Sequence, residues 1–222
     1  GLALADKHGI HIWDMFLCSQ GTFGKMFARG EADSADVFLN RMASLLIPSR
    51  SLDSSFYFYL KAAKHFFVNE LQQAEECARQ GAFHCEQSGW LWGISHMKMT
   101  LGRMLFHRGK HAEGLTMVRE SRTEDATNVP ACHLSTQEYL SYLAEAEFAL
   151  VLGDEAGCAN ALRQSLAVAQ RHGFLNHTWW QPLLMSRLYA IALTHDIEPD
   201  YVRRIIKLRG LTPPADVPVP DT

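Results

Sequence analysis

The sequence predicts an all-α fold, a solenoid of antiparallel helix pairs. Short turns recur along the chain at a near-constant spacing, and small or apolar residues recur at constant distances from each turn. The segments between the turns carry apolar residues at helical spacing, and no useful length of chain alternates with the period of two that is typical of a strand. These observations together favour tandem helix pairs over any fold that contains a sheet.

The turns are centred on Gly30, Asn69, Gly109 and Gly153, at successive intervals of 39, 40 and 44 residues. Glycine and asparagine tolerate the left-handed backbone conformation that commonly ends a helix. A nearly constant interval of this length is typical of a repeat protein in which each unit is one helix–turn–helix pair.

Residues at four constant distances from these turns are mostly small or apolar, with Phe23 as the large exception at its position. Seven residues before the turn stand Phe23, Ala62, Gly102 and Ala146, five after it stand Ala35, Ala74, Gly114 and Cys158, nine after it stand Leu39, Ala78, Val118 and Leu162, and twelve after it stand Met42, Gly81, Ser121 and Ser165. Small residues on both helices allow close approach of the two backbones, and the apolar position fills the gap to the next pair. This register predicts where the helices of each pair touch.

The turns and periodicity together give predicted boundaries. We expect helix pairs over residues 11–47, 52–88, 90–124 and 134–173, closing helices over 177–209, one helical-repeat domain over 1–211 and a proline-rich linker over 212–222. Pro199 suits the first turn of the last helix and Gly210 suits its end. The chain begins without methionine, on what reads as the end of a helix, so we expect it to be a segment of a longer polypeptide.

The register resembles that of the tetratricopeptide repeat, although the interval is nearer 40 residues than the 34 of that family. The resemblance implies a right-handed solenoid. Lengthened repeats of this kind are similar to those in the regulatory arms of large bacterial transcription activators, of the maltose-activator or LuxR-related ATPase type or with a bacterial transcriptional activator domain. The stretch from Ala192 to Pro214 resembles the segment that closes the helical repeats in those regulators, ahead of a linker to a winged-helix DNA-binding domain.

Composition excludes several classes of function. A net charge of −3 and a pI near 6.4 argue against a domain that wraps a phosphate backbone, so we expect no nucleic-acid binding by this chain itself. The basic run of Arg203, Arg204, Lys207 and Arg209 reads as the solvated face of the closing helix. No apolar run reaches membrane-spanning length, so we expect no membrane partner. Five scattered cysteines favour reduced thiols in the cytoplasm.

Motifs for catalysis are missing from the sequence. No phosphate-binding glycine loop, nucleophile elbow or HExxH motif occurs, and the histidines and cysteines do not fall at metal-ligand spacing. We therefore expect no catalytic residue, no metal site, no cofactor and no enzymatic activity.

Runs of aromatic residues are the candidate binding site. The runs are residues 56–59, residues 90–92 and residues 179–180, and each lies where the first helix of a pair is predicted to begin. Neighbours on a helix point about 100° apart, so one ring of each run should face a groove or its rim. The candidate ligand- or partner-binding residues are Tyr57, Tyr59, Trp90, Trp92, Trp179 and Trp180. Packing between layers of the stack is the alternative role for these rings, and an aromatic groove for a small ligand or a peptide is the functional one.

The resemblance implies that the chain is a regulatory arm of a cytoplasmic bacterial transcription regulator. This arm would sense an inducer or a protein partner and mediate self-association into a homo-oligomer. DNA would then be bound through a domain outside this segment. The alternative is a stand-alone tetratricopeptide scaffold, or a chaperone-like module that docks peptides.

Overall fold

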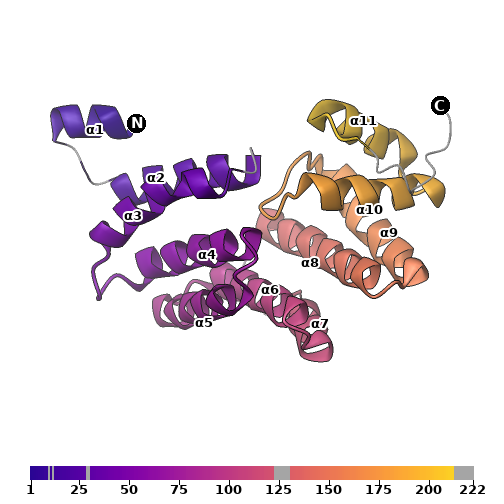
Figure 1. Ribbon diagram of the computed structural model, residues 1–222, viewed down its shortest axis with the longest axis horizontal. Helices are drawn as coiled ribbons and strands as arrows, with labels where there is room; N and C mark the ends of the chain where they lie inside the picture. The colour runs from indigo at the N-terminus through magenta and orange to yellow at the C-terminus, as the bar shows by residue number, and fades with distance from the viewer. Residues whose placement is uncertain (10, 12, 29–30, 123–130, 213–222) are drawn as a thin grey trace. The chain divides into compact units, whose positions relative to one another are not determined.

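A computed structural model describes residues 1–9, 11, 13–28, 31–122 and 131–212 (Figure 1). These residues form helices joined by turns and contain no strand, which confirms the all-α class for the part of the chain described. The chain divides into two compact units, Gly1–Met117 and Val118–Thr222, and the division falls within one helix, α7.

The first unit consists of three helix pairs preceded by a short helix. Its elements are α1 (Leu2–His8), α2 (Asp14–Phe23) extended by a π-helical turn (Gly24–Ala28), a 3-10 turn (Asp33–Ala35) leading into α3 (Asp36–Leu45), α4 (Ser51–Phe67), α5 (Leu71–Ser88), α6 (Leu91–His107) and the greater part of α7 (His111–Glu120). Successive helices pack on each other, α2 on α3, α4 on α5 and α5 on α6. Helices that are neighbours in the sequence are thus also neighbours in space within this unit.

The turns within these pairs have the predicted backbone conformation. Asn69 between α4 and α5, Gly109 between α6 and α7, and Gly153 in the second unit have φ values of 61°, 86° and 74°. A left-handed φ is costly for most side chains, so glycine and asparagine at these positions end one helix and let the next begin within a few residues. The predicted turn at Gly30 lies outside the described residues.

The small and apolar positions of the register form the core between paired helices. Of the sixteen residues, all except Phe23 are buried, and Phe23 is half-buried. One close approach of two backbones is at Gly114 of α7, where a Cβ atom would lie 2.5 Å from the carbonyl oxygen of Gly102 on α6. The predicted reason for small residues at these positions, backbone proximity, is thus confirmed at this pair.

The second unit contains a long hairpin and two closing helices. They are α8 (Ala131–Val151), α9 (Glu155–His172), α10 (Pro182–Thr194) and α11 (Pro199–Arg209), and α10 packs on α8, α9 and α11. Asp154 caps α9 by accepting a hydrogen bond from the backbone N–H of Gly157 at 2.9 Å. Figure 1 shows α8 and α9 side by side, with α10 across them.

The closing helix α11 has the predicted ends and the predicted buried face. Pro199 occupies the first turn and Gly210 ends the helix with φ 59°. Tyr201, Val202 and Ile205 are buried, and the hydroxyl of Tyr201 donates a hydrogen bond to the carbonyl oxygen of Phe174. An amphipathic helix of this kind covers apolar surface that α10 would otherwise expose.

One predicted boundary is wrong. Trp179 and Trp180, placed at the start of a first helix by the sequence pattern, lie instead in the turn that precedes α10. Pro182 is the first residue of α10, and Gln181 before it is extended, with φ −123° and ψ 112°. Proline disfavours helical geometry in the residue before it, so the helix starts at Pro182 and not at 177.

Two predictions about domains are not tested by these helices. The linker predicted over 212–222 lies, apart from Thr212, outside the described residues. A single repeat domain over 1–211 stays a prediction.

Candidate functional site

Aromatic rings form a continuous row through the first unit. The row is built from Phe56, Tyr59 and Phe67 of α4, Phe23 of α2, Phe27 of the following π-helical turn, and Trp90, Trp92 and His96 at the start of α6. Centroid separations between neighbours are 4.7 Å for Phe56–Trp90, 5.1 Å for Trp90–Trp92, 5.3 Å for Trp92–His96, 4.9 Å for Tyr59–His96, 6.1 Å for Phe23–Tyr59, 5.3 Å for Phe23–Phe27 and 5.6 Å for Phe27–Phe67. We call these eight residues the aromatic row.

The row joins the first helices of three consecutive pairs. Phe23 ends α2, Tyr59 is in the third turn of α4, and Trp92 is in the first turn of α6. The rings are tilted or edge-to-face, arrangements in which the positive edge of one ring meets the negative face of another. Such contacts hold the rings in place, so the half-buried members of the row are preorganised.

The row is partly exposed at both ends. Phe56, Trp90 and Trp92 are half-buried, as are Phe23 and Phe67, whereas Tyr59 is only 5% exposed. Trp90 lies over the backbone of Gly93, where an added Cβ would come within 2.2 Å of the indole. Glycine at 93 therefore leaves room for the indole, which also contacts Phe56 and Trp92.

The predicted site residues fall into two groups. Trp90, Trp92 and Tyr59 belong to the aromatic row, and Tyr57 packs beside Phe58 at 5.1 Å. Tyr57 and Tyr59 are buried, with 8% and 5% exposed, whereas Trp90 and Trp92 are half-buried. A binding role for the six predicted residues stays a prediction.

Trp179 and Trp180 are in the second unit and are core residues there. They are 1% and 4% exposed, and the expectation that one of them faces outward is wrong. The Trp180 ring lies 5.2 Å from His177, and the Arg209 guanidinium sits 4.5 Å over its centroid. Both indoles are buried because they lie in a turn. Adjacent residues on a helix point about 100° apart, so a single helix face would have buried only one of them.

The cysteine thiols are suited to packing. Burial raises the pKa of Cys85 to about 11 and that of Cys158 to about 12. Thiols with such pKa values stay protonated at neutral pH, and the thiolate is the form that attacks or binds metal. Cys18 is also fully buried, and burial raises its pKa as well.

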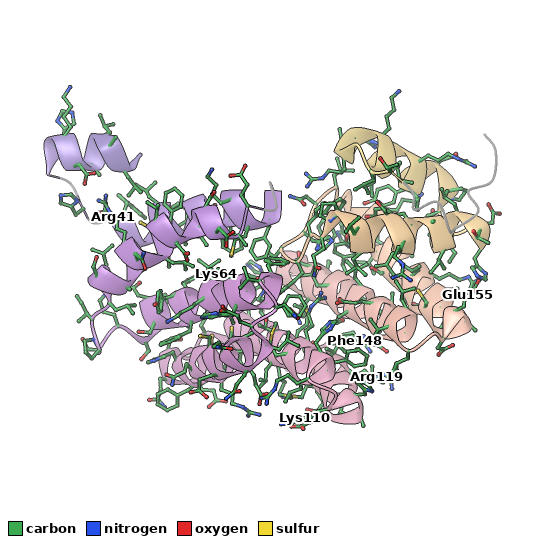
Figure 2. All side chains as sticks on the ribbon, viewed as in Figure 1. Arg41, Lys64, Lys110, Arg119, Phe148 and Glu155 are labelled. Carbon is green, nitrogen blue, oxygen red and sulfur yellow. The ribbon has the colours of Figure 1, made fainter. Side chains whose placement is uncertain are left out.

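Three side chains near the N-terminus could in principle hold a metal ion. Asp6, His11 and Asp14 each place one ligand atom within 4.8 Å of the others. Arg41 of α3, labelled in Figure 2, donates to Asp6 Oδ1 at 2.8 Å and to Asp14 Oδ2 at 2.5 Å. The guanidinium thus supplies the positive charge at this cluster, and its hydrogen bonds hold the pKa of both carboxyls below the ordinary value. We assign the cluster a structural role, the attachment of α1 to α3.

Several members of the aromatic row were not predicted. Among the residues seven before each turn, Phe23 is the large one. Its ring fills the space at that position and contacts Tyr59. That departure from the register was visible in the sequence. His96, Phe27 and Phe67 carried no such signal, because their neighbours across the pair are known only once the helices are packed.

Comparison with known proteins identifies no relative: no family model, no curated protein and no solved structure matches the chain. Among the described residues, no helix combines the length and apolar character needed to cross a membrane.

Proposed function

We propose that this chain is a helical-repeat binding arm, a right-handed tetratricopeptide-like solenoid whose first helices present aromatic side chains to a protein partner or a small-molecule inducer. The observation that carries the proposal is the aromatic row, which runs without a break across α2, α4 and α6. Large rings held by their neighbours lose little freedom when a ligand binds, and aromatic residues dominate many binding surfaces.

Repeat geometry supports a regulatory role for such an arm. Each helix pair contacts mainly its neighbours, so a ligand that spans several first helices favours one arrangement of the pairs over another. A change of arrangement at the row would then be transmitted along the repeats. This is how we propose that the arm relays a signal.

The proposed setting is a cytoplasmic bacterial transcription regulator. Its support is the resemblance of the stretch from Ala192 to Pro214 to the segment that closes the repeats in such activators. The helical ends at Pro199 and Gly210 fit a closing helix at that place. In this setting the arm also mediates self-association, and DNA is contacted by another domain of the full-length protein.

A stand-alone scaffold that docks peptides is the second candidate, and the aromatic row suits it equally well. The full-length open reading frame separates the two. A winged-helix pattern encoded after Thr222 is the expected result, and a stop codon directly after Thr222 would assign the chain to the scaffold class.

Binding by the row can be tested with a displayed peptide library. Peptides selected on the wild-type chain should bind at least about tenfold more weakly to a Trp90→Ala, Trp92→Ala double variant, because each truncation removes a half-buried ring. Leu183→Ala is the matched control, since Leu183 is 84% exposed and lies in the second unit. Selected peptides that bind the double variant as well as the wild type would assign binding to another surface.

A further inference from the structure

A pocket of about 500 Å³ opens on the first unit, away from the residues of the aromatic row. Lys61 and His65 of α4, Gln72, Gln73 and Glu75 of α5, and Arg108 after α6 contribute to its lining. The volume lies within the roughly 300–1,000 Å³ usual for small-molecule sites. The lining is rich in charged and amide groups, so polar interactions would govern what binds there.

Glu75 is a buried carboxylate with several cationic neighbours. It is 5% exposed and accepts hydrogen bonds from Arg79 Nε at 3.0 Å, from Arg79 Nη2 at 2.7 Å and from Arg108. The ammonium of Lys110, labelled in Figure 2, lies 3.8 Å from the same carboxylate. Burial alone would raise the pKa of Glu75, but the arginine hydrogen bonds outweigh it and hold the pKa below its ordinary value. Glu75 is therefore ionised at neutral pH and holds the arginine side chains in place.

The charged groups that line the pocket balance, but one carboxylate is shared by several cations. Lys61 and Arg108 are the lining cations, and Glu75 and Glu76 are the lining carboxylates. The Glu75 carboxylate is also contacted by Arg79 and Lys110, which lie outside the lining. The negative charge of Glu75 is therefore already offset where an anion would approach Lys61 and Arg108.

Lys61 is the cation available to a ligand. Its ammonium lies 5.5 Å from the centroid of the Tyr57 ring, a cation–π contact that holds the side chain over α4. No carboxylate within the described chain forms an ion pair with Lys61. Lys64, in the next turn of α4, is paired with Asp36 at 3.1 Å. Lys61 can therefore pair with an incoming anion without losing an existing salt bridge.

We propose that this pocket binds a small organic anion through a carboxylate or phosphate group held by Lys61 and Arg108. The side-chain amides of Gln72 and Gln73 offer both donors and acceptors to the remainder of the ligand. This inference does not depend on the link to transcription or on the aromatic row. It concerns a separate site, and each proposal can fail without the other.

Isothermal titration calorimetry of the whole chain tests the proposal, with citrate and inorganic phosphate as probes and sodium chloride used to match ionic strength. Saturable binding of at least one probe is expected, and comparison of the two distinguishes carboxylate from phosphate as the preferred group. Lys61→Gln should weaken binding by roughly tenfold or more, since a hydrogen bond to a charged group is lost. Lys61→Arg, which keeps the charge, should restore most of the affinity.

Lys207→Gln is the matched control, because it changes the net charge equally but lies on the exposed face of α11. It should leave the dissociation constant unchanged. Absence of saturable binding by both probes would overturn the proposal. Equal weakening by Lys207→Gln and Lys61→Gln would also overturn it, since the effect would then be one of overall charge.

Discussion

At the scale of single residues, the pairing of α6 with α7 depends on the absence of a side chain at Gly114. An added Cβ would lie 2.5 Å from Gly102 O and 2.7 Å from the backbone nitrogen of Phe106. Both are backbone atoms of a helix, which cannot move aside as the end of a flexible side chain could. Glycine is required here because the two helices touch, even though glycine inside a helix is otherwise unfavourable.

Gly114→Ala should therefore destabilise the chain by about 1–3 kcal/mol, the usual range for overpacking. Gly24→Ala is the control, since Gly24 has helical angles, φ −60° and ψ −39°, and no atom would lie within 4 Å of its added Cβ. That control should stabilise by up to about 1 kcal/mol through helix propensity. Denaturant unfolding of both variants measures the difference, and a Gly114→Ala variant as stable as the wild type would show that the helices do not approach closely at this position.

At the same scale, residues whose role depends on their size are predictable from the sequence. Residues whose role depends on contacts with another helix are not. The small positions at Ala74, Gly114 and Cys158 follow from a constant distance to a turn, and all are buried. The ring contacts of His96 and the cation cluster around Glu75 join residues of different helices, and no local pattern specifies which residues meet. Such contacts become predictable only when the pairing of helices is known.

At the scale of elements, an ion pair links α1 to α3. Helix α1 contains no buried residue, and its link to α3 is the hydrogen-bonded pair of Asp6 with Arg41. The same guanidinium binds Asp14 at the start of α2. Three elements thus share one arginine, and the pKa values of both carboxyls are lowered by its hydrogen bonds.

Acid should release α1. Because the folded-state pKa values of Asp6 and Asp14 are below their unfolded values, the stabilisation is complete above about pH 4 and is lost as the pH falls through the folded values. Backbone chemical shifts of residues 2–8 should be helical at pH 6 and lose helical character toward pH 2. Arg41→Gln should produce the same loss at pH 6, whereas Arg163→Gln on the exposed face of α9 should not. Helical shifts for residues 2–8 in Arg41→Gln at pH 6 would assign the attachment to apolar contacts instead.

Helix ends were predictable where a residue type dictates backbone geometry. Asn69, Gly109, Gly153 and Gly210 end helices as expected. The predicted start of the closing helices at residue 177 lies before the observed start of α10 at Pro182, because proline disfavours helical geometry in the residue that precedes it. The aromatic content of this segment does not decide where the helix begins.

At the scale of the whole molecule, the distribution of charge bears on what the chain binds. The net charge is −3, and the exposed basic residues of α11 are Arg203, Arg204 and Lys207. Arg209 is turned toward the Trp180 ring. A few cations on one short helix can neutralise only a few phosphates.

The chain alone should accordingly bind duplex DNA weakly or not at all at physiological salt. Fluorescence anisotropy of a labelled duplex measures this directly. Sub-micromolar binding that disappears when charge is reversed at Arg203, Arg204 and Lys207 would contradict the prediction and would make α11 a DNA contact.

We propose that the helix pairs follow one another as a right-handed solenoid. A crystal structure of the 222-residue chain tests this proposal most directly. We expect α4 and α5 to stack on α2 and α3 with a right-handed turn, and α6 and α7 to stack on α4 and α5 in the same sense. A structure in which these pairs turn with the opposite hand would contradict the proposal.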